Sequence, residues 1–107
     1  MKLTLDGLKE YLAQLEPLDI AGTPLSMSRC LIASYALWLL KDEEGVMVRV
    51  RADNTQVTVV YVNENRMVLD VPDDIMRIAD KFDYMDRYFV TRKDLESAMP
   101  ELFAPHE

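Results

Sequence analysis

Two residue types that carry much of enzyme chemistry are almost missing from this chain, which has one cysteine and one histidine. A single cysteine excludes an intramolecular disulfide and fits a reducing compartment. One residue of each type is also too few for a zinc site. Catalysis by Cys30 would need a base to form the thiolate, and the only histidine, His106, lies in the tail 104–107, which we expect to be disordered. We therefore expect Cys30 to act as a small buried hydrophobe.

Glycine and basic residues are also scarce. Gly7, Gly22 and Gly45 are isolated, so the sequence contains no glycine-rich phosphate loop. Twelve Lys and Arg face nineteen Asp and Glu, giving a net charge of −7. A protein that binds nucleic acid directly neutralises phosphates with basic side chains, so this function is disfavoured. With no pair of catalytic carboxylates to single out, we predict a protein that is not an enzyme and carries no cofactor or metal.

No apolar run is long enough for a membrane span, which needs about 20 residues. The most apolar stretch, 30–40, is interrupted only by Ser34 and predicts a buried helix. The segment 1–6 lacks the apolar core of a secretory signal. We expect a cytoplasmic protein with no membrane contact, and its 107 residues fit a single domain, 1–107, with one core.

Apolar residues at helical spacing predict four helices. We expect Thr4 to cap the first helix, and Thr91 with Asp94 to form a capping box at the last. The predicted spans are 5–16, then from Pro24 or Met27 to 41, then from Asp73 to between Phe82 and Met85, and finally 92–99.

The segment 46–71 alternates apolar and polar residues, which predicts strands near 46–52, 55–62 and 66–71. A turn at Asp53-Asn54 would pair Val48 with Val59 and Val50 with Val57, all on one face. A three-residue loop at 63–65, with Asn65 left-handed, would then set Val59 against Leu69 and Val57 against Val71. The fold class is therefore α+β, a three-stranded antiparallel meander packed on helices, in the order ααβββα(β)α. The bracketed strand, 87–91, is either a short fourth strand with Tyr88 and Val90 on one side or an extended link.

The same register defines the far face of the sheet. It predicts one row of Met47, Val60 and Val68, a second of Arg49, Thr58 and Asp70, and a third of Arg51 and Gln56. If helices cover only the other face, this surface meets water as an apolar row bordered by arginines, as in a protein contact surface. Alternatively, the last helix or residues 88–91 cover it.

Aspartates are dense between 70 and 86, but their spacing is not that of a calcium loop. A solvated helix face explains them better than a cation site does. Carboxylates spaced along a rigid helix can also occupy a basic groove that normally holds phosphates. A phage-type inhibitor of a nucleic-acid enzyme would have this feature.

These observations predict a non-catalytic protein-interaction domain, acting as a small acidic regulator, inhibitor or assembly subunit. The rival hypothesis is a small enzyme or ligand-binding protein with a pocket between the second helix and the sheet. The edge strands 46–52 and 66–71 also allow a homo-oligomer. The candidate protein-binding residues are Met47, Arg49, Arg51, Val60 and Val68 on the sheet, and Asp73, Asp74, Asp80 and Asp83 on the third helix.

Overall fold

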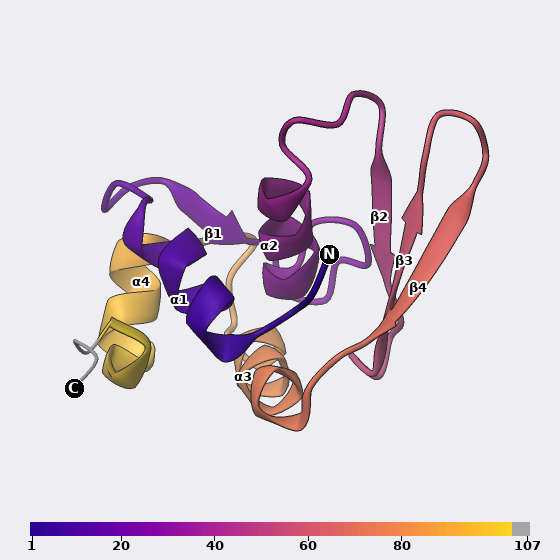
Figure 1. Cartoon of the computed structure of the whole chain (residues 1–107). Coiled ribbons are helices and arrows are strands. Elements are labelled where there is room, and N and C mark those ends of the chain that lie inside the picture. Colours follow the sequence, from indigo (N-terminus) through magenta and orange to yellow (C-terminus); the bar gives the residue numbers. More distant parts are fainter. Residues whose placement is uncertain (104–107) are drawn as a thin grey trace.

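The computed structural model describes residues 1–103 and confirms the α+β fold. A three-stranded antiparallel sheet of order β2-β3-β4 stands on one side, with the helices on the other (Figure 1). The elements are α1 (Leu5–Ala13), β1 (Ile20–Gly22), α2 (Leu31–Leu39), β2 (Met47–Val50), β3 (Gln56–Val60), β4 (Arg66–Asp70), α3 (Asp73–Asp83), β5 (Val90–Thr91), α4 (Arg92–Ala98) and the 3-10 helix η1 (Pro100–Phe103).

The first helix begins where predicted. The Thr4 side chain accepts a hydrogen bond from the Gly7 N–H at 2.9 Å, which satisfies one of the free donors of the first turn. α1 ends at Ala13 instead of residue 16. Its inner face is buried through Leu8, Tyr11 and Leu12, and the Tyr11 hydroxyl donates to the Ala21 carbonyl at 2.9 Å, so α1 is tied to β1.

The predicted start of the second helix was wrong. A start at Pro24 is excluded because Leu25 is left-handed (φ 63°), which a right-handed helix cannot include. A start at Met27 is excluded because Cys30 is extended (φ −66°, ψ 177°), so α2 begins at Leu31. Residues 24–30 instead form a loop closed by a hydrogen bond from the Thr23 N–H to the Arg29 carbonyl at 2.7 Å. From Leu31 on, the apolar run forms a buried helix as expected. Among residues 1–103, no helix is long and apolar enough to cross a membrane.

The register of the first hairpin is as predicted. Val48 lies opposite Val59 and Val50 opposite Val57, and all four valines are buried against the helices. At the turn, Asn54 has φ 61°, a conformation that asparagine tolerates better than most residues. Alternating burial along β2 and β3 therefore sets the inner face of the sheet, as the valine pattern indicated.

The register of the second hairpin differs from the prediction by two residues. Val59 lies opposite Met67 and Val57 opposite Leu69. The connection has the expected three residues but lies one residue earlier, at 62–64, since the Tyr61 N–H donates to the Asn65 carbonyl at 2.9 Å. Glu64, not Asn65, is left-handed (φ 67°). A shift of two keeps every side chain on its predicted face, because side chains alternate with a period of two.

Residues 90–91 do form a strand, but it does not join the meander. β5 pairs with β1 in a separate two-stranded sheet, and β1 was not predicted. Tyr88 is exposed while Val90 is buried, so the prediction that these two side chains lie on the same side of a strand was wrong.

The predicted capping box of α4 was confirmed, with Thr91 and Asp94 exchanging two hydrogen bonds of 3.2 Å. α3 also lies within its predicted span, whereas the expectation for 104–107 falls outside the described residues.

Candidate functional site

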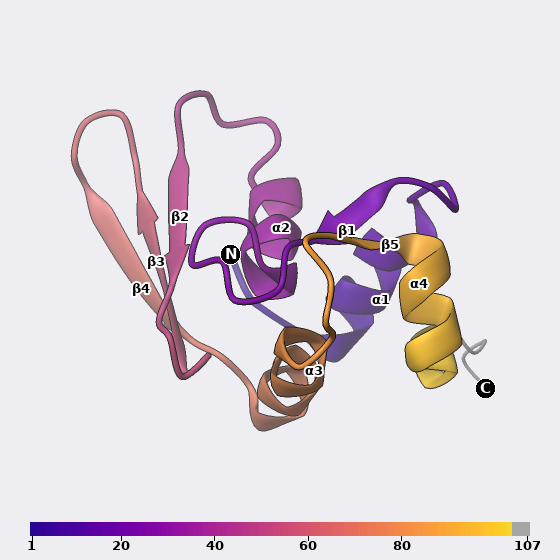
Figure 2. The same ribbon diagram turned by 180° about the vertical axis from the view of Figure 1, so that it is seen from behind.

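The outer face of the three-stranded sheet is exposed, which answers the question that the sequence left open. The Met47 side chain is 68% exposed and Val68 is 56% exposed. Arg49 and Arg51 are also exposed, while Val60 is half-buried. The helices lie against the opposite face, as both views of the ribbon show (Figures 1 and 2). The five predicted sheet residues therefore share one accessible surface.

The rows on this face differ from the predicted ones because of the two-residue shift. Val60 pairs with Arg66 instead of Val68, and Thr58 pairs with Val68 instead of Asp70. Asp70 lies opposite Gln56, whose Nε2 donates to its Oδ1 at 3.3 Å. Arg66 therefore lies in the row of Met47 and Val60, where Val68 was predicted. Asp70 does not share a row with Arg49 as predicted. The sequence had not placed Arg66 in the candidate site.

A concavity of about 560 Å³ opens on this face. Its second wall is the loop 24–30, which is held against β2 by two contacts of Met27. The Val50 N–H donates to the Met27 carbonyl at 2.7 Å, and Arg49 Nη2 donates to Met27 Sδ at 3.2 Å. The lining residues are Met27, Ser28, Met47, Val48, Arg49, Thr58, Val60 and Arg66.

The outer face is basic on a protein whose net charge is −7. It carries Arg49, Arg51 and Arg66 with Asp70 as the only acid among the outward positions of the three strands. Arg51 pairs with Asp53 at 3.3 Å in the exposed turn, so Arg49 and Arg66 supply most of the positive charge beside the concavity. Methionine and valine floors with arginine rims are typical of protein contact surfaces.

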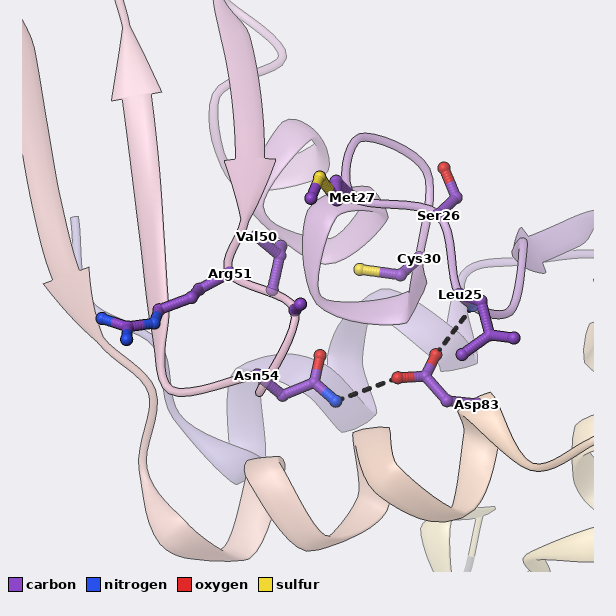
Figure 3. Close-up of a pocket in the computed structure, with 9 residues that line it drawn as sticks. Leu25, Ser26, Met27, Cys30, Val50, Arg51, Asn54 and Asp83 are labelled. Atoms are coloured by element: carbon purple, nitrogen blue, oxygen red, sulfur yellow. Dashed lines mark hydrogen bonds between the residues drawn. The ribbon is translucent and has the colours of Figure 1, made fainter.

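The four candidate aspartates of α3 divide into two pairs. Asp73 and Asp74 are exposed at the start of the helix. Asp80 and Asp83 each accept a hydrogen bond from Asn54 Nδ2 at 2.9 Å. Asp83 also accepts one from the Leu25 N–H at 3.0 Å, and Figure 3 shows both bonds of Asp83. This second pair therefore holds the β2–β3 turn and the loop 24–30 on α3.

Asn54 itself was missed as a structural residue. Its side chain is 5% exposed even though it is polar. The sequence indicated only its place in a turn, because the carboxylates that it contacts lie far along the chain on another element. No local pattern signals such a bridge, so it could be found only once the turn and α3 are placed together.

A small pocket of about 130 Å³ lies between the loop 24–30, the β2–β3 turn and the end of α3. Figure 3 shows Cys30, Val50 and Asn54 around it. Cys30 is buried as predicted. Removal from water is the main cause that raises the pKa of its thiol, and this outweighs the lowering effect of the hydrogen bond from the Ala33 backbone. Cys30 is therefore a thiol at neutral pH, which disfavours a nucleophilic role.

We expect native Cys30 to react slowly with a disulfide reagent at pH 7, because both burial and the raised pKa keep the thiolate scarce. Labelling should become fast when the protein is unfolded in urea. The measurement is the labelling rate at pH 7 and 8.5, with and without urea, and Cys30→Ser is the control that must take no label. A native rate equal to the unfolded rate would instead make Cys30 accessible and support the pocket as a reactive site.

A second exposed apolar group was also missed. Tyr84 is 90% exposed, Tyr88 95% and Phe89 52%, all in the segment 84–89 between α3 and β5. Within this segment Met85 is half-buried, and Arg87 forms an ion pair with Asp94 at 3.3 Å, while the aromatic side chains face solvent. Exposed aromatic residues are enriched at protein interfaces.

No group of side chains suited to hold a metal ion is found within residues 1–103. Comparison of the chain with protein-family models, with curated proteins and with solved structures finds no match.

Proposed function

We propose that this protein is a non-catalytic docking module that binds an acidic surface of another protein through the outer face of its sheet. It would act as a regulator, an inhibitor or an assembly subunit. The observation that carries the proposal is the exposed, basic and apolar face of β2-β3-β4 on a chain whose net charge is −7. A face of opposite sign to its protein attracts partners that the rest of the surface repels.

The concavity suits an apolar side chain of the partner with carboxylates around it. Met47 and Val60 supply an apolar floor, and methionine adapts its shape to what it contacts. Arg49 and Arg66 at the rim can each hold a carboxylate with two parallel hydrogen bonds. Removal of the partner's apolar group from water would supply affinity, and the arginines would set specificity.

Arg49→Glu combined with Arg51→Glu should weaken binding of the partner at least about tenfold, because like charges facing each other cost several kcal/mol. Folding should change little, since both residues are exposed and the Arg51–Asp53 pair is a surface ion pair of small worth. The partner would be identified by affinity capture from the native host with mass spectrometry, and its affinity measured by calorimetry. Arg77→Glu with Lys81→Glu makes the same charge change on α3 and should leave binding intact.

The acidic helix α3 is the second candidate surface. Through it the protein would act as a phage-type inhibitor, occupying the basic groove in which a target enzyme holds nucleic acid. Exposed Asp73 and Asp74 support it. Asp73→Asn with Asp74→Asn tests it without disturbing Asn54, which the substitution of Asp80 or Asp83 would do. Loss of binding in this variant, with the Arg49 and Arg51 variant unaffected, would move the docking site from the sheet to α3.

The rival function, an enzyme or ligand-binding protein, would use the pocket beside Cys30. Its volume of about 130 Å³ holds a few water molecules, whose share of the liquid is about 30 Å³ each. Pockets for drug-sized ligands are larger, about 300 Å³ or more. The pocket beside Cys30 is therefore smaller than such ligands require.

A further inference from the structure

The two edges of the three-stranded sheet are not equivalent. The β2 edge is partly covered by the loop 24–30, since the Val50 N–H donates to the Met27 carbonyl at 2.7 Å. β4 pairs only with β3 among the described residues. Figures 1 and 2 both place β4 at the rim of the molecule, on the side away from α1 and α4. A bare edge strand is a template for another strand.

The hydrogen bonds that flank β4 show which of its backbone groups are free. The Tyr61 N–H donates to the Asn65 carbonyl, and the Val71 N–H donates to the Thr55 carbonyl, both at 2.9 Å. Hydrogen-bonded pairs alternate along an antiparallel ladder. The odd-numbered residues from 65 to 71 therefore direct their N–H and C=O groups toward β3. Those of Arg66, Val68 and Asp70 point out of the sheet edge.

The side chains of β4 are complementary to themselves in the reverse direction. When the strand Arg66–Asp70 is laid antiparallel to a second copy with Val68 opposite Val68, each Arg66 faces an Asp70. Each Met67 then faces a Leu69 on the other side of the sheet. We propose that this protein forms a two-fold dimer by antiparallel pairing of β4 with β4 of a second copy, centred on Val68.

This register is favoured over its neighbours by both the backbone and the charges. It pairs all three residues whose backbone groups point outward, whereas a shift by two leaves Asp70 or Arg66 beyond the end of the partner strand. Opposite charges directly across a strand pair are stabilising, and like charges are not. Charged residues usually protect an edge from pairing. Here they permit pairing in one direction and one register.

Dimer formation would also cover the inner side of the strand. Met67 and Leu69 are half-buried, while the corresponding valines of β2 and β3 are buried. A two-fold axis perpendicular to the sheet puts the helices of both copies on one side and both outer faces on the other. The result is a six-stranded sheet with two docking faces side by side. The dimer goes beyond the proposed docking and does not depend on it. In the dimer Arg66 faces Asp70 of the second copy, so Arg49 is the arginine lining the concavity that stays available to a docking partner.

Reversal of one charge at a time tests the register. Arg66→Asp or Asp70→Arg places like charges opposite each other twice and should weaken self-association at least about tenfold. The double variant, Arg66→Asp with Asp70→Arg, should restore the dimer, and a mixture of the two single variants should form a 1:1 heterodimer. Sedimentation equilibrium over a range of concentrations reports the mass, which should rise from the 12.4 kDa of one chain to twice that value.

Arg49→Asp is the matched control, since it makes the same charge change on the same face but on β2, and it should leave the dimer intact. Hydrogen exchange supplies a second measurement. The amides of Arg66, Val68 and Asp70 should gain protection as concentration rises, while those of Met67 and Leu69 are protected throughout. A chain that stays at 12.4 kDa at millimolar concentration, or a folded double variant that fails to associate, would overturn the proposal. Either result leaves the docking proposal standing, because that is tested at Arg49 and Arg51.

Discussion

Asn54→Asp should lower the free energy of unfolding by about 3 kcal/mol at pH 7, the cost expected for a buried charge without a counter-charge. The Asn54 amide now donates to both Asp80 and Asp83 at 2.9 Å. A carboxylate at this position donates nothing and sets a third negative charge beside two others, in a place that is 5% exposed. Urea denaturation at pH 7 measures the loss.

Asn54→Gly is the control for this prediction, because glycine keeps the positive φ of the turn and removes the amide without adding charge. It should cost about 1.5 kcal/mol, in the range for hydrogen bonds to charged groups. The difference between the two variants should shrink as the pH is lowered toward about 4, where carboxyl groups become protonated. Equal stability of Asn54→Asp and the parent protein would show that the turn is not bound to α3.

Gly22→Ala should also be costly, at about 2–3 kcal/mol, which is the upper part of the range of about 1–3 kcal/mol for inserting a methyl group into a packed interior. An added Cβ would lie 2.8 Å from the Leu31 nitrogen, 2.9 Å from the Cys30 carbonyl carbon and 3.0 Å from Phe82 Cζ. Two of these are backbone atoms at the start of α2, which cannot rotate away as a side chain tip can. β1 would have to move from α2, and the loss is measurable by thermal or urea unfolding.

Thr23→Ala is the neighbouring control, since it removes atoms from a half-buried side chain and keeps the backbone N–H that binds the Arg29 carbonyl. We expect it to cost less than about 1 kcal/mol. If Gly22→Ala were as mild as Thr23→Ala, the close approach of β1 to α2 and α3 would not exist in solution.

The inner face of the sheet was predictable because a single physical constraint, the burial of alternate valines, acts on it at every second residue. That constraint cannot distinguish a register from one shifted by two, since both bury the same side chains. The first hairpin was right because its turn was recognised at Asn54. The second was shifted because the connection was taken as 63–65, while the structure closes it from Tyr61 to Asn65 with Glu64 left-handed.

The features that the sequence did not reveal all depend on contacts between distant segments. β1 and β5 are too short to carry a pattern, and each exists because the other lies beside it. The loop 24–30, which the sequence did not predict, includes Leu25, whose N–H donates a hydrogen bond to the Asp83 side chain on α3. The exposure of Tyr84 and Tyr88 depends on how the segment 84–89 is anchored. Of the candidate site, the sheet residues were placed together as predicted, whereas Asp80 and Asp83 proved to be engaged with Asn54.

The pairing of β1 with β5 has a consequence for synthesis of the protein on the ribosome. β1 leaves the exit tunnel long before Val90 and Thr91 have been translated, so Ile20–Gly22 must wait without its neighbour. Contacts between residues so far apart are slow to form, because the intervening chain must first be ordered. We expect the meander, whose strands are neighbours along the chain, to form before the small sheet closes.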